Sequence, residues 1–533
     1  MSLARSLIVH NGHAFSLADC PLLPIEQFRE EVVEGVAAGG RLAAFLAYPG
    51  KSGALRLLAA VARAGEGDVA VVSADAGSQY AAITPDCPQA HLFEREIFER
   101  WNIRPLGHPW LKPVRFPLLP SPACRTRQDG RGTQRVPGGE GVPPSLSGEG
   151  TQRVPGGEAE SPCGVIDFFQ MAGEEVHEVA VGPVHAGIIE PGHFRFQYHG
   201  ETVYHLEISL GYQHRGVERA MLGGPSGRTI HYAETLAGDS TAGHAAAYCR
   251  AVEALSATRV PARGQFLRGL ALELERVANH IGDLGALAGD VGFLPTMSYC
   301  GRIRGDVLNM TAMLCGNRFG RGMIRPGGAV FDADARLVEQ LRRRLDAVAR
   351  DARSAVELLW NTPSVMARFD GVGVVPLDLC EQLGLVGVAA RACGAARDVR
   401  RDFPYGIYRF AHIPVSTWHS GDVFARAHVR WLEVQRSLAF LGEQLDAMPE
   451  GRISEPAGVL AADQAVVTLI EGWRGEICHV AVTGHDGRFT AYKVVDPSFH
   501  NWMGLAMALR NQQISDFPLC NKSFNLSYCG FDL

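Results

Sequence analysis

Three long segments of the chain repeat apolar residues at intervals of three or four positions. The longest stripe comprises Leu267, Leu270, Leu274, Val277, Ile281, Leu284 and Ala288. This interval matches the 3.6-residue period of an α-helix, so the stripe predicts a central core helix. Residues 337–359 and 424–445 have the same period and predict two more amphipathic helices. Together the three segments predict a bundle of long helices.

The first predicted helix also carries a charged stripe on another face. This stripe comprises Glu273, Arg276, His280 and Asp283, again at intervals of three and four. Side chains at these intervals are neighbours on a helix surface and can form ion pairs along it. We therefore expect an internally paired surface, with contact to a partner protein as the alternative.

Residues 1–120 predict a small mixed α+β domain. A helical period over residues 24–37 ends at Gly39-Gly40, and the apolar runs RLAAFLAY and DVAVVSA are typical of short buried strands. An acidic helix follows in the segment HLFEREIFERW and carries Glu94, Glu96, Glu99 and Arg100. We expect these charges to form a helix face in contact with solvent or with a partner.

Residues 121–162 have the composition of a linker. They are rich in Gly, Pro and Ser and contain the nonapeptide GTQRVPGGE twice. Such a segment buries too little apolar surface to offset its chain entropy, so we expect it to be disordered and without chemistry.

Residues 163–533 predict one large, mainly helical unit with β-hairpins on its flank. The hairpins are predicted in HEVAVGPV, FRFQYHGETVYHLEISL and EICHVAVTGHDGRFTAYKVV, where β-branched residues surround HG or HDG turns. The predicted fold class is therefore α+β, with a small mixed domain, a linker and a large helical domain.

Composition excludes several classes of function. Hydrophobic residues make up 46% of the 533 residues and charged ones 20%, with a net charge of −6 and no run of Lys and Arg. Nucleic acid is therefore not an expected partner. The chain has no apolar segment of signal-peptide or membrane-spanning length, so we expect a soluble cytoplasmic protein.

The twelve cysteines lack the spacing of a metal or redox motif. No two of them are separated by two residues, so the chain contains no CxxC. In an intracellular protein such cysteines are most simply reduced residues of the core.

Several longer motifs resemble one family in their content and order. They include GPVHAGIIEPGHFRF, GYQHRGVE, GHAAAYCRAVE, GWRGEICHV, KVVDPSFHNW and DFPLCNKSFNLSYCGFDL. This set resembles the large subunit of nickel-iron hydrogenases, above all the energy-converting hydrogenases and formate hydrogenlyase, with the quinone-site subunit of complex I as another relative. Residues 80–117 resemble the small hydrophilic subunit of complex I, which is often fused ahead of the larger one.

The resemblance also shows what the chain lacks. In the hydrogenases that it resembles, two CxxC motifs hold the metals, and the four corresponding positions here are Ala237, Ser240, Ser498 and Asn501. Thiolates suit nickel and iron, whereas Ala has no donor and Ser or Asn only a hard oxygen. We therefore expect no nickel-iron centre, no other metal ligands and no hydrogenase activity of this chain itself.

Four other positions match functional residues of the relatives. Glu190 matches a glutamate that carries protons away from the metals, and His214 matches a histidine close to the quinone of complex I. His244 follows the first lost CxxC, and Arg474 corresponds to the arginine that faces the ligands of the iron. The alternatives are a structural glutamate at a hairpin and histidines whose hydrogen bonds are satisfied in the core.

The resemblance leaves the contents of the site open. Complex I relatives place a tyrosine before the helix of His244, but Gly238 stands there in this chain. Without iron, Arg474 needs another anionic partner, and Asp239 and Asp496 are the candidates. Asp239 and Thr241, with His214, are the candidate wall of a quinone site or of a polar, hydrated cavity.

We therefore expect a subunit of a membrane-attached oxidoreductase complex with a nickel-free cavity. The resemblance implies an iron-sulfur partner subunit, ion-translocating membrane subunits, and a place on the inner face of the cell membrane. In this hypothesis Glu190, His214 and His244 move protons in step with electron transfer. The alternatives are a quinone-reducing subunit, as in complex I, and a scaffold that joins the iron-sulfur and membrane subunits without catalysis.

Overall fold

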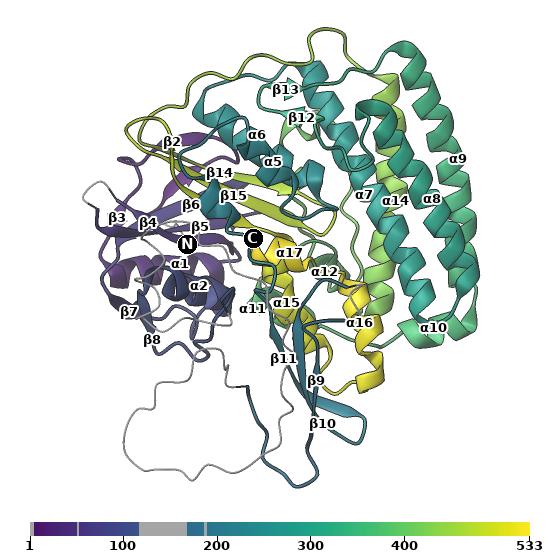
Figure 1. The fold of residues 1–533 in the computed structure, drawn as a ribbon, viewed down its shortest axis with the longest axis horizontal. Coiled ribbons are helices and arrows are strands. Elements are labelled where there is room, and N and C mark those ends of the chain that lie inside the picture. The colour runs from purple at the N-terminus through teal and green to yellow at the C-terminus, as the bar shows by residue number, and fades with distance from the viewer. Residues whose placement is uncertain (1–4, 51–52, 117–167, 186–188) are drawn as a thin grey trace, which may run out of the picture.

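The computed structural model describes residues 5–50, 53–116, 168–185 and 189–533, which form an α+β fold (Figure 1). The predicted linker at 121–162 lies outside these residues. A central sheet separates the N-terminal elements on one side from a bundle of long helices on the other. The predicted fold class is confirmed.

The N-terminal elements form a five-stranded sheet with a helix on one face. The sheet contains β1 (Leu7–Val9), β3 (Leu22–Leu23), β4 (Arg41–Pro49), β5 (Leu55–Arg63) and β6 (Asp68–Asp75), in the order β1-β6-β5-β4 with β3 beside β6. Helix α1 (Ile25–Ala37) buries Phe28 and Val32. The helix predicted at 24–37 and the two predicted strands, β4 and β6, are confirmed.

Four long helices make up the bundle at the right of Figure 1. They are α7 (Ala262–Asp290), α8 (Leu294–Cys315), α9 (Ala335–Trp360) and α14 (Val423–Asp446). The three predicted helices correspond to α7, α9 and α14, and all seven apolar residues of the predicted α7 stripe are buried. The pattern of α8 is weaker because large apolar side chains, such as Leu294 and Met297, are exposed on it.

The charged stripe of α7 does not form a surface, so this part of the prediction was wrong. Glu273, Arg276 and His280 are fully buried. Glu273 forms ion pairs with Arg276 and Arg400 and accepts hydrogen bonds from Tyr408 (2.7 Å) and Ser437 (2.6 Å). The stripe therefore joins α7 to α14, to the short helix α13 (Val399–Asp402) and to the 3-10 helix η2 (Gly406–Arg409). The spacing along one helix does not reveal these partners.

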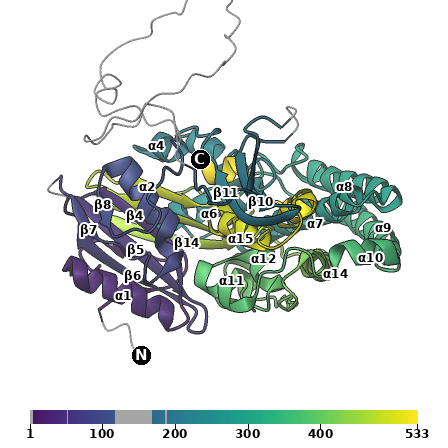
Figure 2. The ribbon, with the colours of Figure 1, turned by 90° about the horizontal axis from the view of Figure 1, so that it is seen from below.

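The central sheet has the order β16-β15-β14-β2 and lies in the core. Its strands are β2 (Ala14–Ser16), β14 (Gln464–Glu471), β15 (Glu476–Thr483) and β16 (Phe489–Val495), and helix α6 (Thr241–Leu255) packs on it. The hairpin predicted in 476–495 is present, but its predicted place on the flank was wrong, because every residue of β15 is buried. Since β2 comes from the first 20 residues, the N-terminal part and the large part share this sheet, and they lie against each other in Figure 2.

A second, three-stranded sheet lies at the edge of the molecule. It consists of β9 (His177–Val181), β10 (His193–His199) and β11 (Thr202–Ser209), in the order β11-β10-β9. This sheet is the predicted flanking hairpin pair, and it projects downwards from the region of α15 at the lower centre of Figure 1.

Helix α2 (His91–Trp101) holds the N-terminal part to the large part. Its predicted exposure to solvent was wrong, because Glu94, Glu96 and Glu99 are all buried. Glu96 forms ion pairs with Arg115 and with Lys493 of β16 (2.6 Å). The acidic face is therefore an interface within the chain, formed between segments about 400 residues apart in sequence.

We expect Glu96→Ala to lower the free energy of unfolding by about 3 kcal/mol, because Arg115 loses its ion-pair partner in the core. Lys493 would keep only Glu218, which lies 3.2 Å away. Urea denaturation followed by circular dichroism measures the effect. The control is Glu66→Ala at an exposed turn, with an expected change below about 0.5 kcal/mol. Equal effects of both variants would contradict the anchoring role of Glu96.

Candidate functional site

The predicted site residues gather around the last described segment of the chain. Helix α15 (Pro497–Ala508) begins after Asp496, whose carboxylate accepts the backbone N–H of Ser498 (2.8 Å) and caps the helix. After α16 (Phe517–Phe524), residues 525–533 and the short helix α17 (Tyr528–Asp532) run through the same region. We call residues 525–533 the C-terminal segment.

His244 lies at the middle of a fully buried chain of hydrogen bonds. Its Nε2 is 3.0 Å from Oδ2 of Asp496, and its Nδ1 is 3.1 Å from Nε2 of His479. Nδ1 of His479 is 2.9 Å from the hydroxyl of Tyr492. With neutral imidazoles, one assignment is consistent throughout: Tyr492 donates to His479, His479 to His244, and His244 to Asp496.

The surroundings hold this chain in that state. Burial and the nearby His244 hold the pKa of His479 well below its ordinary value, and burial raises the pKa of Tyr492 well above it. Burial alone would raise the pKa of Asp496, but the hydrogen bond from His244, the positive charge of Arg474 and the N–H of Ser498 act against it, and the net shift is downward. Asp496 is therefore an ionised acceptor at the end of a line of neutral donors.

Arg474 finds its partner in Asp239. Two parallel hydrogen bonds join Nη1 and Nη2 of Arg474 to the carboxylate oxygens of Asp239, at 2.6 and 2.8 Å. The Nε of Arg474 donates to the carbonyl oxygen of Asn525 in the C-terminal segment (2.5 Å). Burial lowers the pKa of Arg474, but Asp239 more than compensates, so the net pKa is raised and the charge is permanent.

His214 and Glu190 contact the C-terminal segment from another side. Nδ1 of His214 lies 2.6 Å from the carbonyl oxygen of Asp532, and Glu190 accepts the N–H of Tyr528 (3.3 Å). Burial lowers the pKa of His214, and burial raises the pKa of Asp532 to about 6. No hydrogen bond between the described residues joins Glu190 or His214 directly to the chain of His244.

Two of the four positions that are predicted to have lost metal ligands lie at the start of α6 (Thr241–Leu255). Ala237 is fully buried and offers no donor atom. Ser240 is buried beside Arg474, whose Nη1 lies 3.4 Å from its hydroxyl oxygen. Thr241 is also fully buried, and its hydroxyl donates to the carbonyl oxygen of Glu234 (3.1 Å).

The other two positions lie on α15 and are engaged by the backbone. The hydroxyl of Ser498 accepts the N–H of Ser527 (2.8 Å), and the amide of Asn501 makes two hydrogen bonds to the backbone of Val386 (2.9 and 3.1 Å). A nickel-iron centre does not fit this donor set, because the oxygens present are committed to protein groups. Within the described ranges, no three His, Cys, Asp or Glu side chains gather closely enough to hold a metal ion.

Glu275 of α7 is a titratable group that the sequence did not single out. Its carboxylate accepts the backbone N–H groups of Ala242 (2.6 Å) and Gly243 (3.2 Å) in the first turn of α6. It lines a small pocket together with Asp239. Burial raises the pKa of Glu275 to about 8, and the nearby charge of Asp239 adds to the shift.

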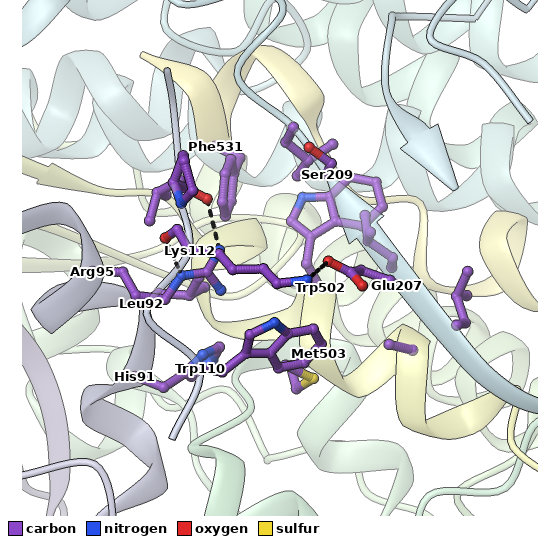
Figure 3. Close-up of a pocket in the computed structure, with 16 residues that line it drawn as sticks. His91, Leu92, Arg95, Trp110, Lys112, Glu207, Ser209, Trp502, Met503 and Phe531 are labelled. Atoms are coloured by element: carbon purple, nitrogen blue, oxygen red, sulfur yellow. Dashed lines mark hydrogen bonds and ion pairs between the residues drawn. The ribbon is translucent and has the colours of Figure 1, made fainter. Parts of the chain in front are cut away.

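A different pocket, of about 60 Å³, lies between α2, β11 and the C-terminal elements (Figure 3). In it Lys112 donates to Glu207 (2.6 Å), and Arg95 donates to the carbonyl oxygens of Lys112 and Pro113 (2.7 Å each). This space suits a few water molecules, and none of the predicted site residues lines it.

Comparison with known proteins decides the family. The chain is 31% identical over 351 residues to the carbon monoxide-induced hydrogenase of Rhodospirillum rubrum, covering 66% of this chain and 97% of that protein. The chain belongs to the hydrogenase large-subunit family. Residues 290–461 match the family described as the 49 Kd subunit of respiratory-chain NADH dehydrogenase, which is complex I.

Two further relatives represent the two sides of this family. Formate hydrogenlyase subunit 5 of Escherichia coli (strain K12) is 27% identical over 457 residues, covering 84% of this chain and 76% of that protein. A subunit of the NADH-quinone oxidoreductase of Dehalococcoides mccartyi is 30% identical over 341 residues, covering 63% of this chain and 92% of that protein. The predicted resemblance is therefore confirmed. No helix in the described part of this family member is long and apolar enough to cross a membrane.

Three residues of the hydrogen-bonded chain around His244 were not predicted to be its partners. His479 and Tyr492 lie within apolar runs that predict strands, and nothing in those runs marks them as partners of His244. Asp496 precedes Pro497 at the start of α15, and this Asp-Pro pair in a family motif was the available signal.

We expect Glu275→Gln to reduce the loss of stability between pH 5 and pH 8. Because the folded-state pKa of Glu275 is raised from 4.5 to about 8, its bound proton contributes stability that is complete below pH 4.5 and is lost as the pH rises to about 8. Glutamine cannot ionise, so this loss should disappear. Thermal unfolding over this pH range measures it, with the exposed Glu357→Gln as control. Parallel pH profiles of the wild type and Glu275→Gln would contradict the assignment.

Proposed function

We propose that this chain is the large hydrophilic subunit of a membrane-associated oxidoreductase complex related to hydrogenases and complex I, working without a nickel-iron centre. One observation carries the nickel-free part: the four positions of the metal ligands hold Ala237, Ser240, Ser498 and Asn501, and the oxygens among them are engaged by protein groups. Family membership supports the rest, because relatives are named as subunits of formate hydrogenlyase, membrane-bound hydrogenase and NADH-quinone oxidoreductase.

The buried chain of Tyr492, His479, His244 and Asp496 is the proposed proton-transfer element. Neighbouring groups in the chain are 2.9–3.1 Å apart. When His244 gives a proton to Asp496, His479 gives one to His244, and the hydroxyl of Tyr492 gives one to His479. Tyr492 lines a cavity of about 70 Å³ beside β4 and α2, and water in this cavity is the proposed source of the replacement proton. Arg474 favours the ionised form of Asp496.

Glu190, His214 and Asp532 form a second proposed group on the other side of the C-terminal segment. Nδ1 of His214 contacts the backbone carbonyl oxygen of Asp532. Burial raises the pKa of Asp532 to about 6, and the nearby charge of Glu190 adds to this shift. This pKa allows proton exchange near neutral pH. In the proposed complex these groups exchange protons as electrons arrive from an iron-sulfur partner, and membrane subunits use that exchange to move ions.

The quinone-reducing alternative has weaker support. Thr241 is fully buried and bound to a backbone carbonyl, and Asp239 is held by Arg474 in two hydrogen bonds, so neither is free to bind a quinone head group. Gly238 is exposed with open space around its Cα, which leaves no donor where complex I relatives have a tyrosine. Insensitivity of turnover to quinone-site inhibitors would count against this alternative.

The complex purified from its native cells should contain iron, from its iron-sulfur partner, and nickel only far below one atom per chain. Thiolates are absent from all four ligand positions, and the remaining oxygens bind nickel weakly. Inductively coupled plasma mass spectrometry measures both metals in one sample, so iron is the internal control. Nickel in a stoichiometric amount would overturn the nickel-free part of the proposal.

We expect His244→Gln and His479→Gln to lower turnover of the assembled complex by about 100-fold, because a glutamine cannot pass a proton along the chain. His428→Gln on α14 is the matched control, since His428 is a half-buried histidine packed against Trp418 and Phe424, outside the hydrogen-bonded chain. Size-exclusion chromatography checks assembly. Unchanged turnover of both relay variants, with intact assembly, would favour the scaffold alternative.

A further inference from the structure

A large cleft opens at the opposite end of α6 from His244. It has a volume of about 1120 Å³ and lies between the turn that joins β1 to β2, the end of α6, and residues 403–410. Arg250 lines it and follows His244 by six residues, which is about 9 Å along the helix. We call this space the Arg250 cleft; Figure 1 shows β2 and α6 close together at its location.

The lining of the Arg250 cleft is cationic. Arg250, Arg259 and Arg409 line it, and none of them forms an ion pair with a carboxylate within the described ranges. His10, His13, Arg250 and Arg409 all line the cleft, and the pKa of His13 is lowered by burial and then by the charges of the other three. Their mutual repulsion is relieved by an anion placed between them.

The one carboxylate in the lining is committed elsewhere. Glu253 receives two hydrogen bonds from Arg268 (3.0 and 2.5 Å) and one from the N–H of Gly327 (2.7 Å). Among the described residues no hydrogen bond joins Glu253 to Arg250, although the charge of Glu253 raises the pKa of Arg250 against the effect of burial. Glu253 therefore neutralises Arg268 and leaves the cleft with an excess of positive charge.

Arg250 is fixed in position and still has an N–H group without an acceptor. Its Nη2 donates to the carbonyl oxygen of Asn11 (3.1 Å), and its guanidinium lies over the ring of Tyr405 (5.2 Å). Its Nε is buried without a hydrogen-bond partner, and burial lowers the pKa of Arg250 to about 10. A buried N–H without an acceptor is unfavourable, and an oxyanion bound at the guanidinium relieves this.

Two further features suit a small molecule. The cleft is slightly larger than the range of about 300–1,000 Å³ that is typical of ligand pockets, so it has room for a small molecule. Phe410 stands at its rim with 85% of its surface exposed, beside Arg409. An apolar ring next to unpaired guanidinium groups suits a ligand with an anionic end and a flat or apolar part.

We propose that the Arg250 cleft binds a small molecule that carries phosphate or carboxylate groups, through Arg250 and Arg409, with Phe410 against its apolar part. This site is separate from the hydrogen-bonded chain of His244 and does not depend on the function proposed above. Its occupant contacts both the N-terminal part and the large part of the chain, because residues of the β1–β2 turn and of α6 line the cleft together.

Isothermal titration calorimetry on the purified full-length chain at low ionic strength tests the proposal. The probes are inorganic phosphate, adenosine diphosphate and citrate, so that a phosphate ligand and a carboxylate ligand are distinguished. We expect at least one probe to bind, and the double variant Arg250→Gln/Arg409→Gln to weaken its binding by at least about tenfold. Arg343→Gln/Arg353→Gln, which removes two exposed arginines of α9, is the matched control and should bind as the wild type does.

A second variant tests the site while keeping both arginines. A Cβ on Gly12 would lie 2.3 Å from Nη2 of Arg250, so Gly12→Ala must displace the guanidinium. We expect it to weaken binding as the double variant does, with circular dichroism confirming that the chain is folded. The proposal is overturned if no probe binds the wild type, or if binding to the double variant falls by less than tenfold.

Discussion

Charged side chains buried in this protein each need a partner, and this requirement determines how its parts are joined. Charge buried without a partner costs several kcal/mol, so each ionised group in the core must meet an opposite charge or several hydrogen-bond donors. Glu96 meets this condition by binding Lys493, and Glu273 by binding Arg276 and Arg400. Lys493 is 397 residues from Glu96 and Arg400 is 127 residues from Glu273, so these two ion pairs join distant parts of the chain.

The same requirement explains the candidate site after the loss of the cysteines. Arg474 remains where relatives are expected to place it against an iron ligand, and its charge is balanced here by Asp239 in a bidentate pair. Ser498 and Asn501 stand at positions of thiolates and form hydrogen bonds to the backbone instead. The region that a metal would occupy in a relative is thus stabilised by hydrogen bonds among protein groups.

The amphipathic elements could be predicted from the sequence, and the partners of buried polar groups could not. Helices α7, α9 and α14 could be predicted because each is buried on one face, so that its apolar residues recur at helical spacing in the sequence. Strand β15 is buried along its whole length, so its apolar run carries no sign of its central place. Glu275 likewise shows nothing unusual in sequence, since its raised pKa depends on the first turn of α6 packed over it.

The family and the fold class follow from the sequence without coordinates, and the prediction that the metal ligands are missing rests on the sequence alone. Motifs in a fixed order, and the residue types Ala237, Ser240, Ser498 and Asn501, are local properties of the chain. Folding was needed to show that His244 lies between His479 and Asp496, that Arg474 binds Asp239, and that Arg250 faces an open cationic cleft. Hydrogen bonds and electrostatic forces act over a few ångströms in space, and the groups concerned are up to hundreds of residues apart in the chain.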